Sequence, residues 1–423
     1  MIYLELFFAV IILLVHLKKK NWQLTLFLVL IFSCFIFTIV RFPLAIHLSE
    51  ESEIYWAYIG RSKGQLLKSL QNTEMPLFYV FYYTLINIFK IDPATSIILL
   101  RFLICIMIGF SYLHFSKNIL KKQSMNKSLV IFIPTFFCLY DWNINYLALG
   151  DELRNALALP FLILLLDSIS ESKYYFAIFY ALLAFFSHKL GIVFSLLTFP
   201  LFFLIKRFQS KINKYHICIF LPILTLVLIK LFRKIIFLGG NRYIISQINH
   251  NILLGILDGL LRRPGVILAE IIYLSLFYIS IRNFEKIKLN ATLLTSLTLS
   301  IIVFTASNYG IIMYERFQEP NRFYFMLGIY LPIVAGSSLL EFSKKIIVMY
   351  VVGFFLANFL FKQFARDVIN IYAAHAGSPL ADLINYIILN KSYIGCIFLI
   401  LILILFSALF KRKIFSKETY PPI

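Results

Sequence analysis

The chain has few of the residues that build disulfide scaffolds and metal sites. Its 423 residues include five cysteines. They lie in or at the edge of apolar runs, without CxxC spacing, so we predict neither a disulfide nor a metal site from them. They are Cys34, Cys105, Cys138, Cys218 and Cys396. Linkers rich in serine, glycine or proline and internal repeats are also missing, which predicts one domain over residues 1–423.

Acidic residues are scarce as well, with 20 against 40 lysines and arginines. The resulting net charge of +20 does not predict nucleic-acid binding, because no basic stripe lies outside the polar links between apolar runs. Cytoplasmic links of membrane proteins are rich in lysine and arginine, which accounts for the charge. No nucleotide-binding motif is present, and we predict no cofactor.

Apolar runs make up most of the sequence. Hydrophobic residues make up 61% of the chain, whereas a soluble protein is about 45–50% apolar. The mean hydropathy is +0.86. Because the apolar runs alternate with short polar links, we predict an all-α, polytopic integral membrane protein with about 13–14 membrane segments.

The stretch Gly150–Gly191 predicts a helical hairpin around which the rest is organised. Two apolar runs, Ala156–Leu166 and Tyr174–Phe186, follow one another across a short polar link. Each is about 15 residues with its flanks, or about 22 Å as a helix. Arg154 and His188 should then lie at the same depth on the same side of the membrane. Such placement is costly and indicates a function; the alternative is that Arg154 snorkels and His188 caps a helix end.

Lysine-rich links predict the orientation of the chain. Placed in the cytoplasm, they satisfy the positive-inside rule if the short run Pro76–Phe89 is re-entrant or interfacial. These links lie around Lys18, Lys117–Lys127, Lys173, Lys206–Lys214, Arg282–Lys288, Lys344 and Lys411–Lys417. Three candidate active-site loops then face outward, at residues 43–75, 233–264 and 308–322.

Most arginines and most acidic residues fall on the predicted outward side. Arginine there opposes the positive-inside rule, and its guanidinium makes two-pronged bonds to phosphate that lysine cannot make. Neighbouring carboxylates suit general-base chemistry on a hydroxyl. The alternative is surface ion pairing, which contributes little. Nothing in the spacing selects a metal. The candidate catalytic residues are Glu50, Glu53 and His188, and the candidate substrate-binding residues are Arg41, Asp151, Glu152, Arg154, Lys189, Arg316 and Arg322.

Several short motifs recur together in chain order. They comprise Arg41 with Glu50, Glu53 and Tyr55, then Glu-x-Pro-Leu-Phe at Glu74–Phe78, Leu-Arg-Asn-x-Leu-Ala at Leu153–Ala158 and Phe-x-His-Lys at Phe186–Lys189. With these motifs, the stretch Leu24–Pro200 resembles the EpsG-like family of bacterial polysaccharide polymerases, loosely grouped with Wzy-type O-antigen polymerases. A weaker similarity lies at Arg316–Tyr324. The family usually shows an Asp in the first loop, where glutamates stand here.

The resemblance implies an enzyme that joins oligosaccharide units carried on undecaprenyl diphosphate at the outer face of the bacterial inner membrane. It also implies a relation to membrane (C-type) glycosyltransferase folds, which place a catalytic carboxylate in the first outward loop. Its products would be O-antigen, capsule or exopolysaccharide. Its partners would be the lipid-linked oligosaccharide, the bilayer, a chain-length regulator and a flippase.

Residues and resemblance agree on the outline of a mechanism. Outward arginines would bind the diphosphate and stabilise the departing charge, while Glu50, Glu53 or His188 would deprotonate the acceptor hydroxyl. Two other functions stay open. One is a transporter or flippase of lipid-linked oligosaccharides, which should show repeat symmetry and charges at mid-membrane depth. The other is a ligase or single-sugar transferase that uses the same type of donor.

Overall fold

The computed structural model describes residues 76–119, 153–236, 264–307 and 321–339, together with Ile11, Leu14 and Val15. Every regular element within these ranges is a helix, and no strand occurs in them. Three helices are long and apolar enough to cross a membrane, through the stretches Thr95–Tyr112, Leu153–Ser170 and Gly191–Phe208. The predicted all-α class is therefore confirmed for the described part of the chain.

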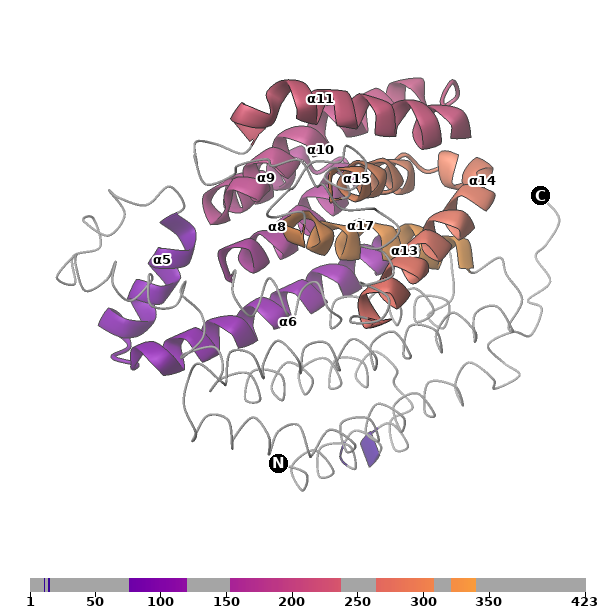
Figure 1. Ribbon diagram of the computed structural model, residues 1–423. Coiled ribbons are helices and arrows are strands. Elements are labelled where there is room, and N and C mark those ends of the chain that lie inside the picture. Colours follow the sequence, from indigo (N-terminus) through magenta and orange to yellow (C-terminus); the bar gives the residue numbers. More distant parts are fainter. Residues whose placement is uncertain are drawn as a thin grey trace.

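The helices lie at the positions of the apolar runs in the sequence (Figure 1). The run Tyr174–Phe186, for example, forms most of α9. In chain order they are α5 (Pro76–Tyr83), a π-helix (Thr84–Ile88), α6 (Pro93–Ile119), α8 (Leu153–Ser170), α9 (Tyr174–Ser187), α10 (Lys189–Phe208), a second π-helix (His216–Phe220), α11 (Leu221–Ile236), α13 (Pro264–Arg282), α14 (Phe284–Lys288), α15 (Ala291–Ser307) and α17 (Asn321–Leu339). The short run after Met75 thus forms a short helix of its own.

Polar caps and a proline explain where two of the helices begin. Pro93 is the first residue of α6, a position where its missing N–H leaves no helical hydrogen bond unmade. The Asp92 carboxylate accepts a hydrogen bond from the Thr95 N–H at 2.9 Å. Asn290 caps α15 in the same way and accepts from the Thr292 N–H at 2.9 Å. These caps satisfy N–H groups that the first helical turn leaves open.

Helices α8, α9 and α10 form two consecutive antiparallel hairpins. Residues 171–173 join α8 to α9, and His188 alone joins α9 to α10. The ring of Tyr174, at the start of α9, lies 5.8 Å from that of Phe203 near the end of α10. Closer to the link, the Ser195 hydroxyl donates to the Ala181 carbonyl at 3.4 Å. Each contact joins residues that lie about equally far from His188, so α9 and α10 are antiparallel and α10 runs parallel to α8.

The link between α9 and α10 requires a glycine. A Cβ atom at Gly191 would lie 1.9 Å from the carbonyl oxygen of Ala184 on the facing helix. That oxygen also accepts a hydrogen bond from the His188 N–H at 3.3 Å. The backbones of α9 and α10 can approach this closely only because Gly191 has no side chain.

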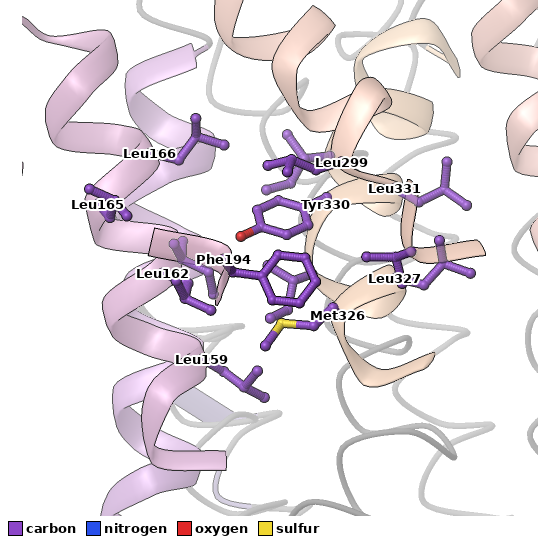
Figure 2. Packing of buried hydrophobic residues seen from close by; sticks show 14 of the residues in the cluster. Leu159, Leu162, Leu165, Leu166, Phe194, Leu299, Met326, Leu327, Tyr330 and Leu331 are labelled. Carbon is purple, nitrogen blue, oxygen red and sulfur yellow. The ribbon is translucent and has the colours of Figure 1, made fainter. Parts of the chain in front are cut away.

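Helices α8, α15 and α17 form the buried centre of the described part. Most residues of α8 and α15 are buried, and α6 and α11 lie at opposite edges with these helices between them (Figure 1). The Phe194 ring of α10 and the Tyr330 ring of α17 lie side by side, with centroids 6.4 Å apart. Leucines of α8 flank this pair on one side and residues of α17 on the other (Figure 2).

Helix α15 carries hydroxyl groups into this buried centre. Its buried hydroxyl residues are Thr292, Thr295, Ser296, Thr298, Ser300, Thr305 and Ser307. Four of these hydroxyls, on Thr295, Ser296, Thr298 and Ser300, donate to the carbonyl four residues earlier at 2.7–2.9 Å. Because such bonds satisfy a hydroxyl within its own helix, α15 is polar and buried at once.

The outer faces of α9 and of the α11 region are apolar. Tyr175 and Phe176 on α9 are 90% and 58% exposed, and Phe220 and Leu231 on the α11 side are 62% and 69% exposed. Contiguous apolar surface of this kind is typical of a face that contacts something other than water. The described helices therefore bury hydroxyls among their apolar core residues and also expose large apolar side chains on the outside.

The close approach at Gly191 predicts a stability defect. Gly191→Ala should lower the apparent melting temperature of the detergent-purified protein, because the added methyl group pushes α9 and α10 apart at a cost of about 1–3 kcal/mol. Ser195→Ala, on the same interface, removes only a long hydrogen bond and should change the melting temperature little. Equal melting curves for Gly191→Ala and the wild type would contradict the packing described here.

Candidate functional site

Hydrogen bonds connect the carboxyl ends of six helices in three pairs, at one end of the bundle. The Asn118 side-chain amide donates to both Asp167 carboxylate oxygens at 2.9 Å, which ties the end of α6 to the end of α8. The Asn283 side chain, after α13, donates to the Ser338 carbonyl of α17 at 3.1 Å. The Gln209 side chain, after α10, donates to the Lys288 carbonyl of α14. We call this the lysine end.

The lysine end collects the basic links that the sequence predicts to face the cytoplasm. The described cations there are Lys173, Lys206, Arg207, Lys211, Lys214, Arg282, Lys286 and Lys288. The Glu171 carboxylate bonds to the Lys173 ammonium at 2.7 Å, and this contact raises the pKa of Lys173. His114 also lies here, 3.2 Å from the buried Asp167 carboxylate. This contact and the Asn118 bonds join the last turns of α6 to the end of α8.

Helices α8, α10 and α17 begin at the opposite end of the bundle, and α6 extends beyond their first residues. Arg154 is the second residue of α8 and Arg322 is the second residue of α17. Lys189 is the first residue of α10, directly after the half-buried His188. Arg101 lies in the first half of α6. We call this the arginine end and define it by Arg101, Arg154, His188, Lys189 and Arg322.

Contacts between parallel helices set the depths of these residues. Asp167 of α8 is bonded to Asn118 of α6. Counting back by the same number of residues from each leads to Arg154 on α8 and to Cys105 on α6. The Tyr112 hydroxyl donates to the Ile329 carbonyl, and the same counting places Arg322 at the level of Cys105 as well. Because parallel helices rise equally, by about 1.5 Å per residue, Arg154 and Arg322 lie at one depth.

The same counting places the other members of the arginine end. Arg101 lies one turn farther out than Cys105, just above the starts of α8 and α17. Phe194 and Tyr330 are in ring contact, and counting back from this pair brings His188 to within one turn of Arg322. The counting thus places four residues that the sequence singled out at similar depths, at one end of the bundle. They are Arg154, His188, Lys189 and Arg322.

The remaining predicted site residues lie outside the described residues. They are Glu50 and Glu53 among the catalytic candidates and Arg41, Asp151, Glu152 and Arg316 among the binding candidates. The loop 43–75 also lies outside, as does most of the loops 233–264 and 308–322. Within the described part, α17 already begins at Asn321, so Arg322 belongs to a helix. Leu153, Arg154 and Asn155 likewise belong to α8, which begins before the apolar run Ala156–Leu166.

Sequence reasoning missed two charged residues inside apolar helices. Arg101 is only 1% exposed and is the largest fully buried side chain in the described part. Glu270 lies in the second turn of α13, the helix that packs against α17. Both could have been found in the sequence as single charges within apolar runs. Such a charge is costly in a membrane and by default indicates a function.

The electrostatics of the arginine end favour an anion. No acidic residue occupies the first turn of α6, α8, α10, α13 or α17. Helix starts carry a partial positive charge that acidic residues or bound anions normally offset. Asp92 offsets it at α6. The first turns of α8, α10 and α17 instead contain Arg154, Lys189 and Arg322.

Asn155 adds a buried polar group beside Arg154. It is 1% exposed, and its side-chain carbonyl oxygen accepts no hydrogen bond from any described residue. A buried acceptor of this kind is costly unless a donor reaches it. Metal ligands do not gather at this end, because no group of three or more His, Cys, Asp or Glu side chains among the described residues is placed to hold an ion.

Comparison of the chain with protein-family models, with curated proteins and with solved structures finds no match in any of the three.

Proposed function

We propose that the chain is a polytopic protein of the bacterial inner membrane, with the lysine end in the cytoplasm and the arginine end facing outward. The exposed apolar faces of α9 and α11 support contact with lipid, since water disfavours so much apolar surface. The cations at the lysine end support its orientation, because short cytoplasmic links carry the excess of lysine and arginine.

At the outward face we propose a polysaccharide polymerase that joins oligosaccharide repeat units from undecaprenyl-diphosphate-linked donors. The observation that carries this proposal is that Arg154 and Arg322 stand in the first turns of α8 and α17, at the same end of the bundle as the His188–Lys189 link. Arginine forks and helix starts both bind phosphate oxygens. The motifs shared with the EpsG-like family, Leu153–Ala158 and Phe186–Lys189, fall at this same end and support the substrate class.

The proposed reaction is a glycosyl transfer that needs no nucleotide. An acceptor sugar hydroxyl attacks the anomeric carbon of the donor and forms the new glycosidic bond. The bond from that carbon to the diphosphate oxygen breaks, and undecaprenyl diphosphate leaves with the electron pair. The arginines stabilise the negative charge of the leaving group. A base takes the hydroxyl proton; His188 is the described candidate, and Glu50 and Glu53 are the candidates in the first loop.

A flippase of lipid-linked oligosaccharides is the second candidate function. The observation that favours it is the presence of Arg101 and Glu270 within apolar helices, since transporters place charges inside the membrane. A flippase moves the donor and forms no bond, whereas the polymerase leaves a longer glycan and free undecaprenyl diphosphate. A ligase or single-sugar transferase would form a bond but produce no ladder of repeat units.

The proposed orientation predicts a labelling pattern. In a background without the native cysteines, a cysteine replacing Ser210 at the lysine end should not react with an impermeant maleimide in intact cells. Cysteines replacing Glu51 or Asn241 should react, because both positions belong to predicted outward loops. Labelling of the Ser210→Cys protein in intact cells, with the envelope shown to be sealed, would refute this orientation.

The phosphate-binding role predicts that Arg154→Lys lowers polymer yield at least about tenfold. Lysine keeps the charge but not the fork, and each lost charge-assisted hydrogen bond removes about 1.5–3 kcal/mol. The measurement is the intensity of the polymer ladder against membrane protein level in a complemented deletion strain. Arg207→Lys, the same change at the lysine end, is the matched control and should leave the ladder unchanged.

Two results would contradict this assignment. If Arg154→Lys gives the same polymer ladder as the wild type at equal protein level, Arg154 does not bind phosphate through its fork and the snorkelling alternative holds. Equal losses from Arg154→Lys and Arg207→Lys would show that the ladder responds to any loss of arginine, and not to phosphate binding at the arginine end.

A further inference from the structure

The link between α10 and the second π-helix carries cations that no described acidic residue neutralises. Lys206, Lys211 and Lys214 are exposed, and none of them makes an ion pair with a residue that the structure describes. The sequence contains no Asp or Glu between Glu171 and Asp258. Lysines this close in sequence repel one another, and a bound anion offsets that repulsion.

Hydrogen bonds fix the conformation of this link. The Lys211 N–H donates to the Phe208 carbonyl at 2.9 Å. Farther along, the His216 N–H donates to the Asn213 side-chain oxygen at 3.0 Å, and the Asn213 N–H donates to the His216 ring at 3.2 Å. Because the lysines stand on an ordered turn, binding an anion there costs less conformational entropy than binding it with a flexible tail.

The link also contacts a second basic segment, α14. The Gln209 side chain donates to the Lys288 carbonyl, which places the backbone of Lys288 against the link. Lys288 makes no ion pair within the described part of the chain. Asp167 and Glu171 at this end are bonded to other groups, which leaves Glu285 as the exposed carboxylate among the described residues here. Four lysines thus face one such carboxylate, and we call them the basic patch: Lys206, Lys211, Lys214 and Lys288.

Exposed apolar side chains lead up to the basic patch on both sides of the link. On α10, Leu196, Phe203 and Leu204 are exposed at spacings of seven and eight residues, which puts them on one face of the helix. Helices α10 and α11 both pack against α15, and the link joins them at the lysine end. A ligand of the basic patch therefore meets apolar surface beside the charge. Beyond the link, the exposed apolar residues are Ile219, Phe220, Ile223, Leu224, Val227, Leu228 and Leu231.

Tyr215 lies where the polar link meets the apolar helices. It is 61% exposed, and the Lys214 ammonium lies over its ring, 5.5 Å from the centroid. Tyrosine rings concentrate at the boundary between the hydrocarbon core and the lipid head groups. Lysines near helix ends extend their ammonium groups to the same level. A phosphate at this boundary is therefore a group that the exposed lysines can reach.

We propose that the basic patch binds anionic phospholipid head groups of the leaflet at the lysine end, with the acyl chains along the exposed faces of α10 and α11. The charge of the patch favours an anionic head group over a zwitterionic one. The adjoining apolar faces favour a lipid over an acidic protein or a soluble anion. The inference requires these helices to lie in a bilayer. It goes beyond the polymerase proposal, because it needs neither a glycan donor nor the arginine end.

The test titrates the purified full-length protein in detergent with phosphatidylglycerol or with phosphatidylcholine of the same acyl chains, and native mass spectrometry measures the bound lipid. We expect the wild type to bind phosphatidylglycerol at least about tenfold more tightly than phosphatidylcholine. A triple variant with Lys206→Gln, Lys211→Gln and Lys214→Gln should lose most of that preference, because each lysine near an anionic head group contributes about fivefold.

A second triple variant, with Lys90→Gln, Lys173→Gln and Lys230→Gln, is the matched control. All three lysines are exposed and lie outside the basic patch, and Lys173 is already bonded to Glu171. The control removes the same total charge and should keep the preference for phosphatidylglycerol within about twofold of the wild type.

Three results would overturn the inference. The first is equal binding of both lipids by the wild type, and the second is a basic-patch variant with the full wild-type preference. The third is soluble glycerol phosphate that binds as tightly as phosphatidylglycerol, which would assign the lysines to a soluble anion. If the variant does not insert, phosphatidylglycerol with a diazirine beside its head group gives the answer on the wild type. Crosslinks within residues 203–224 support the inference, and crosslinks confined to other segments contradict it.

Discussion

The two hydrogen bonds from Asn118 to the Asp167 carboxylate set the register on which the rest of the described structure depends. Asp167 is buried, and a charge-assisted bond in such surroundings is stronger than one in water. It holds α6 and α8 parallel and at a fixed offset. The α8–α9–α10 hairpins and the Tyr112–Ile329 bond carry that offset to α10 and α17, so that cations far apart in sequence meet at one depth.

The distribution of polar groups agrees with a lipid surrounding. Four buried hydroxyls of α15 donate to carbonyls of the same helix, so these four need neither water nor a partner helix. Large apolar side chains on α9 and α11 are exposed on the surface of the bundle instead. In this account, the charges that remain at the two ends have different tasks. Under the proposed function, the lysines at one end would orient the chain and the arginines at the other end would bind an anion.

Sequence reasoning went as far as local patterns allow. The apolar runs and the polar links predicted α9 and the pairing of α8 with α9, because both features are local. The common depth of Arg154 and Arg322 was not accessible, since it depends on Asn118 and Tyr112 meeting partners far along the chain. Arg101 was passed over because one charge hardly changes the apolar character of its run. The catalytic roles of Glu50 and Glu53 stay predictions, because both residues lie outside the described part of the chain.

The central claim is that the arginine end holds a diphosphate-linked glycan while a new glycosidic bond forms. Reconstitution tests it most directly: the purified protein in liposomes, supplied only with the undecaprenyl-diphosphate-linked repeat unit and no nucleotide sugar. The account predicts chains of two or more repeat units together with released undecaprenyl diphosphate, and far less of both from Arg154→Lys. Movement of the intact donor across the bilayer without any chain extension would contradict the account and identify a flippase.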